Sequence, residues 1–95
     1  MKPTRTPAPP TPADDDLATI TGVADIVIDG EPLWVSPGLT PAGRYWALMT
    51  PAHLSAGVVT ERPDGADAVV GTVTTHAPTV QAAAHLVVAA LRTTR

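Results

Sequence analysis

The chain has 95 residues, a length that accommodates one small domain. Its formal net charge is −3 and it has only six Lys and Arg residues, so it lacks the basic surface with which nucleic-acid-binding proteins usually neutralise phosphates. It has no cysteine, which excludes disulfides, thiolate nucleophiles and cysteine-ligated zinc.

Residues 1–16 contain five of the eleven prolines and no large apolar residue after Met1. Such a segment buries too little surface to offset the entropy lost on ordering, so we expect a disordered tail that ends in a solvated run of three aspartates. Residues 17–95 then form the single folded domain. No apolar run approaches the ~20 residues that a membrane-spanning helix needs, and no secretory signal is present. We therefore expect a cytoplasmic protein without membrane contacts.

Residues 17–30 are rich in β-branched side chains and end in the pair Asp29-Gly30. This pair favours a tight two-residue turn, so we predict a hairpin in which Ile28 faces Glu31 and Ile26 faces Leu33. That register also sets Ala24 opposite Val35. One face of the hairpin then belongs to the core (Ala24, Ile26, Leu33, Val35), and the other carries Asp25, Val27, Asp29 and Trp34. Pro32 has no N–H donor, so we expect it at an unpaired or edge position.

Residues 36–42 contain two prolines and Gly38, which predicts a loop. The next residues, 43–49, read GRYWALM and contain the only tyrosine and one of the two tryptophans. Arg44, Trp46 and Leu48 alternate with the other side chains, a pattern that favours a strand. Because both faces are apolar, we expect one face to meet the core and the other to meet a further surface.

Thr50-Pro51 has the form of a helix start, with Thr as the cap and Pro at the first helical position. The following residues, 57–75, are open to two interpretations. Their Val and Thr content and the turn signal Pro63-Asp64-Gly65 favour a hairpin. The alternative is a pair of helices joined at the same turn.

Residues 77–92 (APTVQAAAHLVVAALR) predict a helix, because Ala and Leu are strong helix formers and Pro78 suits a first turn. One broad apolar face contains Val80, Ala83, Val87, Ala90 and Leu91. The polar residues Gln81, His85 and Arg92 form a narrow opposite stripe. Since apolar side chains cover most of the circumference, we expect this helix to be buried on more than one side.

No constellation of residues indicates catalysis. His53, His76 and His85 lack the spacing of a metal-binding pair, and neither a nucleophile elbow nor a phosphate-binding loop is present. We therefore predict that the protein is not an enzyme and that it binds neither a metal nor a cofactor.

The order of these elements resembles the PqqD-like family of peptide-recognition domains, and most closely the stand-alone leader-binding proteins of lasso-peptide biosynthesis. The likeness is carried by Gly43-Arg44-Tyr45-Trp46 with Leu48, by Thr50-Pro51 and by Asp64-Gly65, and it covers residues 18–95. It implies an α+β, winged-helix-like fold in which a three-stranded antiparallel sheet packs on three helices.

The resemblance also implies a function without catalysis. The leader of a ribosomally made precursor peptide would add as a strand along residues 44–48, in a groove walled by the last helix, and would be presented to a maturation enzyme or protease. The peptide-binding residues would be Arg44, Tyr45, Trp46, Ala47, Leu48, Val80, Ala83, Ala84, Val87 and Leu91.

A second hypothesis takes residues 57–75 as a real hairpin. The fold would then be a four- to five-stranded antiparallel sheet with one C-terminal helix. The protein would be a small interaction protein, homodimeric or DNA-binding and carried by a mobile element. Arg62 would lie at the tip of the hairpin in the DNA-binding version. The low positive charge makes nucleic acid the less favoured partner.

Overall fold

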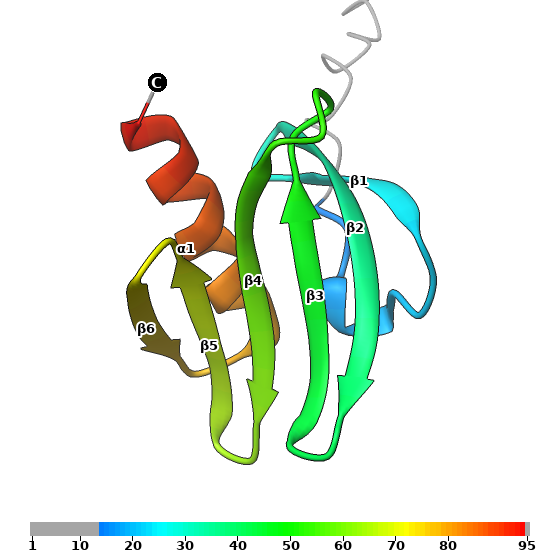
Figure 1. Cartoon of the computed structure of the whole chain (residues 1–95), viewed down its shortest axis with the longest axis vertical. Helices are drawn as coiled ribbons and strands as arrows, with labels where there is room; N and C mark the ends of the chain where they lie inside the picture. Colours follow the sequence, from blue (N-terminus) through cyan, green and yellow to red (C-terminus); the bar gives the residue numbers. More distant parts are fainter. Residues whose placement is uncertain (1–13, 95) are drawn as a thin grey trace, which may run out of the picture.

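A computed structural model describes residues 14–94. Of the tail predicted for residues 1–16, residues 1–13 lie outside the described residues, whereas Asp14 and Asp15 form hydrogen bonds with Val27 and Asp29. A short 3-10 helix and six strands are followed by one helix (Figure 1). The elements are η1 (Leu17–Thr19), β1 (Ala24–Ile28), β2 (Glu31–Thr40), β3 (Gly43–Met49), β4 (Ser55–Arg62), β5 (Gly65–Val70), β6 (Val73–Ala77) and α1 (Val80–Thr93). The strands form one antiparallel sheet in the order β1-β2-β3-β4-β5-β6.

The predicted winged-helix-like fold, with three strands on three helices, is therefore wrong. The described residues form six strands and one α-helix, so the alternative of four to five strands with one C-terminal helix is close. Each strand pairs with its neighbour in sequence. The chain thus needs only short connections, and no crossover helix is required between strands.

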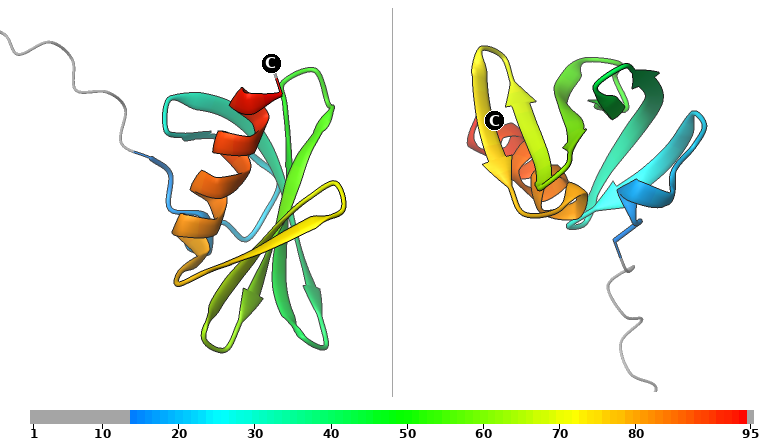
Figure 2. Two further views of the ribbon diagram at one scale, coloured as in Figure 1. Left: turned by 90° about the vertical axis from the view of Figure 1, so that its left-hand side faces the viewer. Right: turned by 90° about the horizontal axis from the view of Figure 1, so that it is seen from below.

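The helix α1 lies across one face of the sheet (Figure 2). It contacts β4, β5 and β6. Because the sheet is curved, the helix also contacts η1 and β1 at the other end of the sheet. The buried core fills the space between them. Its largest fully buried side chains are Trp46, Leu17, Ile28, Leu33, Leu48, Val35, Val59, Val87 and Val88. The helix was expected to be buried on more than one side, but its buried residues lie on one face, while Leu86 and Ala89 are exposed.

The predicted first hairpin is confirmed in register and in face. Ile28 pairs with Glu31, Ile26 with Leu33 and Ala24 with Val35. Asp29 and Gly30 form the turn with positive φ angles of 52° and 75°, the left-handed conformation that a two-residue turn of this type needs. The side chains of Ile26, Leu33 and Val35 are buried, as the alternation requires.

The loop predicted for residues 36–42 is wrong, because β2 continues to Thr40. In this hairpin Val35 directs its N–H toward β1, so by alternation the nitrogen of Pro37 also points to that side, beyond the last β1 pair at Ala24. The nitrogen of Pro32 points the other way, where the β2–β3 ladder has already ended at Trp34. Neither proline therefore costs the sheet a hydrogen bond, because no paired strand lies on the side to which its nitrogen points.

The strand predicted for residues 43–49 is confirmed as β3, with Trp46 and Leu48 on its buried face. The helix start predicted at Thr50-Pro51 is wrong. The chain turns back instead: the Thr50 N–H donates to the Leu54 carbonyl oxygen (2.8 Å), and His53 has a φ of 64°. Tertiary pairing of β3 with β4 on either side of this turn overrides the local helix signal.

Residues 55–70 form the hairpin that β propensity favours, with Arg62 opposite Gly65 across the turn. The C-terminal helix is also confirmed; it begins at Val80, after a Thr79 side chain that accepts the Ala82 N–H (3.0 Å). Its buried residues are Val80, Ala83, Ala84, Val87 and Val88. The buried face is thus rotated slightly from the predicted one, because Ala84 and Val88 replace Ala90 and Leu91.

Candidate functional site

The strand expected to receive a peptide lies in the middle of the sheet. β3 pairs with β2 along one side and with β4 along the other, so its backbone groups are already used. Trp46 and Leu48 are fully buried, and Tyr45 and Ala47 lie on the opposite face of the sheet. The ring of Tyr45 covers Gly38, where an added Cβ would lie 2.3 Å from its Cζ. Strand addition along β3 is therefore incompatible with this fold.

The helix residues of the predicted groove also lie in the core. The buried face of α1 contains Val80, Ala83, Ala84 and Val87, and Leu91 packs at the margin of the same core. The space between β3 and the helix is thus filled with side chains. The sequence pattern located two apolar surfaces, but it did not show that both belong to the same buried core.

Arg44 forms several contacts within the chain. Its guanidinium lies 4.9 Å from the Trp46 ring centroid, donates to both carboxylate oxygens of Glu61 (3.0 and 2.7 Å) and donates to the Ala18 carbonyl oxygen (2.8 Å). The hydrogen bond to Glu61 raises the pKa of Arg44, and its counterpart lowers the pKa of Glu61. The Trp46 indole donates to the Ile20 carbonyl oxygen (3.0 Å). Together these contacts hold the η1 region against the sheet.

The outer edge of β1 is covered by residues 14–17, which we call the N-terminal strap. Val27 donates its N–H to Oδ2 of Asp15 (2.7 Å), and its carbonyl oxygen accepts the Asp15 N–H (2.9 Å). The Asp29 N–H donates to Oδ1 of Asp14 (2.7 Å). The strap therefore satisfies outward backbone groups of this edge, using two carboxylates and one backbone N–H in place of a strand.

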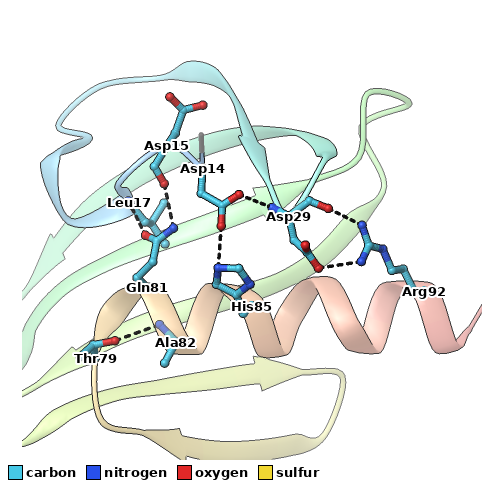
Figure 3. Close-up of polar contacts among 9 residues, drawn as sticks. All are labelled: Asp14, Asp15, Leu17, Asp29, Thr79, Gln81, Ala82, His85 and Arg92. Carbon is cyan, nitrogen blue, oxygen red and sulfur yellow. Dashed lines mark hydrogen bonds and ion pairs between the residues drawn. The ribbon is translucent and has the colours of Figure 1, made fainter. Parts of the chain in front are cut away.

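The polar stripe of α1 holds the strap in place (Figure 3). Gln81 accepts the Leu17 N–H through Oε1 (2.9 Å) and donates from Nε2 to the Asp15 carbonyl oxygen (2.9 Å). One turn further, Nε2 of His85 lies 2.7 Å from Oδ2 of Asp14.

The far end of the same stripe holds the first hairpin. Arg92 donates to Oδ2 of Asp29 (2.7 Å) and also to the Asp29 carbonyl oxygen. The narrow polar stripe of the helix thus binds the first hairpin and its strap. Leu17, fully buried, anchors the strap at its other end.

The opposite edge of the sheet, β6, has no strand or strap beside it among residues 14–94. Gly71 and Thr72 form the two-residue turn that joins it to β5, with Val70 and Val73 as the closing pair. Closing residues of such a turn exchange both backbone hydrogen bonds, and the pattern then alternates. Val73, Thr75 and Ala77 therefore direct their N–H and C=O groups to β5. Thr74 and His76 direct theirs away from the sheet.

An apolar groove of about 240 Å³ adjoins this open edge, between the β5–β6 hairpin and α1. Its lining is almost entirely apolar: Ala68, Val70, Val73, Thr75, Leu86 and Ala90. Val73 and Leu86 are 63% and 38% exposed, so apolar surface reaches solvent beside the open backbone groups. Free backbone donors next to apolar pockets are the two elements by which a sheet edge binds an extended strand.

The other face of this hairpin is polar and charged. Oδ1 of Asp67 lies 2.8 Å from Nδ1 of His76, and its Oδ2 accepts from Nε of Arg62 (2.9 Å). Asp64 lies 3.7 Å from Nε2 of His76. Hydrogen bonds to His76 and Arg62 lower the pKa of Asp67, and the hydrogen bond to Asp67 raises the pKa of His76. Arg62, the candidate DNA contact, thus already pairs with a carboxylate.

The histidines lie apart from one another in the structure. His53 packs edge-on against Trp34, with ring centroids 5.7 Å apart, whereas His76 and His85 pair with aspartates on separate elements. Within residues 14–94, no group of three or more His, Asp or Glu side chains is placed to hold a metal ion. No helix of that part of the chain is long and apolar enough to cross a membrane.

Comparisons of the chain with models of protein families, with curated proteins and with solved structures find no significant match.

Sequence reasoning missed β6 as a separate strand and as an edge. Its signals were present: Gly71 suits the first position of a tight turn because its φ is 60°, and three β-branched residues follow Thr72. The signal that would have located the strap is weaker. Three consecutive aspartates are a solvated run in most chains, and only the sheet edge beside them turns the carboxylates into hydrogen-bond acceptors.

Proposed function

We propose that this chain is a non-catalytic interaction module that binds an extended segment of another polypeptide by strand addition to β6. The observation that carries the proposal is the outward direction of the Thr74 and His76 backbone groups beside the apolar groove. A strand added there would gain backbone hydrogen bonds. It would also bury every second side chain against Leu86 and the neighbouring apolar residues.

The groove suggests the chemistry of the bound segment. Side chains on the helix side of the added strand would be aliphatic, because the lining is apolar and its volume of about 240 Å³ suits one or two such side chains. Side chains on the other face would lie beside Thr74 and His76 and would be polar. We expect an alternating apolar–polar segment. We include the leader of a ribosomally made precursor peptide, delivered to a maturation enzyme or protease, among the segments proposed to bind this edge.

The sequence of β6 supports the proposal in a second way. Proteins commonly protect an exposed sheet edge with lysine, proline or a bulge, since an open edge invites pairing with another chain. β6 reads VTTHA and has none of these, whereas β1 at the other end of the sheet is covered by the strap. An edge left open beside an apolar groove is typical of a binding edge.

The function can be tested by selecting binders from a phage-displayed library of random linear peptides. The affinity of the selected peptides, made synthetically, is then measured by isothermal titration calorimetry. Thr74→Pro removes an outward N–H without removing a bond to β5, so we expect affinity to fall at least about fivefold, the equivalent of ~1 kcal/mol for one hydrogen bond. Thr74→Val keeps the donor and is the matched control. Leu86→Asp should also weaken binding, and Leu86→Met should not.

Circular dichroism would show that all four variants fold. The proposal fails if the library yields no binder, or if binders are insensitive to Thr74→Pro and Leu86→Asp.

A further inference from the structure

The open edge of β6 is complementary to a second copy of itself. Its outward backbone groups belong to Thr74 and His76, which lie on either side of Thr75. If two copies meet antiparallel about a two-fold axis at Thr75, Thr74 of each copy lies opposite His76 of the other. Each such pair exchanges two backbone hydrogen bonds. All five residues of the strand are then paired.

The side chains in this register also match. On the helix side Val73 lies opposite Ala77 of the second copy, and Thr75 lies opposite its own counterpart. On the other side a threonine hydroxyl lies opposite each imidazole. β6 has no Lys, Arg, Asp or Glu, so no like charges meet across the seam.

The other two registers are worse. An axis at His76 would set two imidazoles directly opposite each other, although each already pairs with Asp67 of its own chain. The same axis would set Thr74 opposite Pro78, which has no N–H to donate. An axis at Thr74 would leave Ala77 unpaired and extend the pairing into the turn at Thr72.

A two-fold axis at Thr75 keeps the helices of both copies on one face of a continuous sheet. The groove beside β6 then lies against its counterpart, so Val73 and Leu86, exposed in the single chain, approach the seam from both sides. Within residues 14–94, the strap on β1 leaves each copy with one open edge. Pairing through β6 therefore closes at two copies, whereas two open edges would allow an open-ended chain.

We propose that β6 pairs with β6 of a second copy, about a two-fold axis at Thr75, whenever no other strand occupies this edge. This inference rests on the proposed function, in which β6 accepts an added strand. A ligand segment and the second copy then compete for the same backbone groups, and dimerisation shields the apolar groove until a ligand is present.

Single-cysteine variants test the register directly, because the chain has no cysteine of its own. Thr75 would meet its counterpart as a pair without mutual hydrogen bonds, with Cα atoms about 4.5 Å apart, within the range of a disulfide. Thr75→Cys should therefore form a covalent dimer under mild oxidation. Thr74→Cys is the matched control: its counterpart lies diagonally, about 7–8 Å away, and should cross-link far less.

Light scattering over a range of protein concentrations tests the dimer itself. The wild type and Thr74→Val should be dimeric at high concentration. Thr74→Pro should weaken the dimer at least about thirtyfold, since symmetry removes two hydrogen bonds at once. A peptide selected on β6 should convert the dimer into a complex with one copy.

The outcomes separate the two proposals. A wild type that stays monomeric but binds peptides in a Thr74-dependent way overturns the dimer and leaves the proposed function standing. A dimer that is unaffected by Thr74→Pro, or that cross-links equally through both cysteine variants, also overturns this inference, since its seam lies elsewhere. If neither dimer nor peptide complex forms, both proposals fail.

Discussion

The two edges of the sheet are treated in opposite ways by the same chain. Along β1, the strap supplies carboxylates and a backbone N–H to the outward groups of Val27 and Asp29. Along β6, Thr74 and His76 direct their backbone groups outward, and an apolar groove lies beside them. A sheet edge can thus be closed without a neighbouring strand, by two carboxylates and one backbone N–H, whereas the open edge has its outward backbone groups available for binding.

The helix α1 contacts the surroundings of both sheet edges, each with a different face. Its polar stripe of Gln81, His85 and Arg92 holds the strap and the first hairpin. Its apolar residues Leu86 and Ala90 line the groove at β6. A single amphipathic helix therefore fixes which edge is closed and shapes the surface of the one that is open.

The largest effect is expected on the β6 side, from Gly65→Ala. Gly65 has a φ of 149°, and an added Cβ would lie 2.1 Å from the Ala77 carbonyl oxygen at the end of β6. Backbone strain and overpacking should together lower the free energy of unfolding by roughly 4 kcal/mol, measured by urea denaturation. Gly22→Ala is the control, since nothing lies within 4 Å of its added Cβ. Equal stability of the two variants would contradict the packing of β6 on β5.

The next largest effect should come from Leu17→Ala, which removes the buried anchor of the strap. Truncating a fully buried leucine costs about 3 kcal/mol, and here the loss should also free the β1 edge. Hydrogen exchange at the Val27 amide should accelerate more than exchange at amides of the β3–β4 ladder. Leu39→Ala, at a residue that is 78% exposed, should change stability by less than about 0.5 kcal/mol. A stable Leu17→Ala variant would mean that the strap is not held by this side chain.

A smaller effect is expected from Asp15→Ala, which removes the acceptor of the Val27 N–H. The cost should be about 1 kcal/mol, because water can replace the carboxylate at this exposed edge. Asp15→Asn keeps an acceptor oxygen and should lose less. The rate of Val27 amide exchange in the two variants checks the prediction, and identical rates would show that the carboxylate does not close the edge.

The smallest effect should be a pH dependence at the β6 hairpin. The pKa of His76 is raised above its ordinary 6.5. Its contribution to the free energy of unfolding is therefore complete below about pH 6.5 and is lost as the pH rises through the folded-state pKa. The pKa of Asp67 is lowered from 3.8, so its contribution is present above that value and is lost only in stronger acid. The stability that this cluster contributes is therefore greatest at pH values between the pKa of Asp67 and the pKa of His76. His76→Gln should reduce the fall in Tm above about pH 6.5, and an unchanged profile would contradict the pairing.

Local sequence signals sufficed for part of this fold. The Asp29-Gly30 turn fixed the register of the first hairpin, the alternation around Trp46 located β3, and the content of alanine and leucine located α1. The Thr50-Pro51 pair misled, because a helix start and a tight turn use the same residues and only the pairing of β3 with β4 decides between them. Likewise, Pro37 is compatible with a strand only because β1 has ended beside it.

The candidate site depends on information that no local pattern contains. Strand order decides that β3 is central and β6 is an edge, and strand order is a property of the whole sheet. The apolar faces around Trp46 and Val87 were recognised correctly as apolar, yet they form the core because they meet inside the molecule. The groove beside Leu86 could be recognised only once the helix was placed over β5 and β6.

Amide hydrogen exchange followed by NMR across a range of protein concentrations tests the contrast between the two edges most directly. We predict slow exchange at Val27 and Asp29 at every concentration, because the strap accepts their N–H groups within the chain. Thr74 and His76 should exchange rapidly in dilute protein and slowly once a second copy or a selected peptide pairs with β6. Rapid exchange at Thr74 and His76 under all of these conditions, or equally rapid exchange at Val27, would contradict the account.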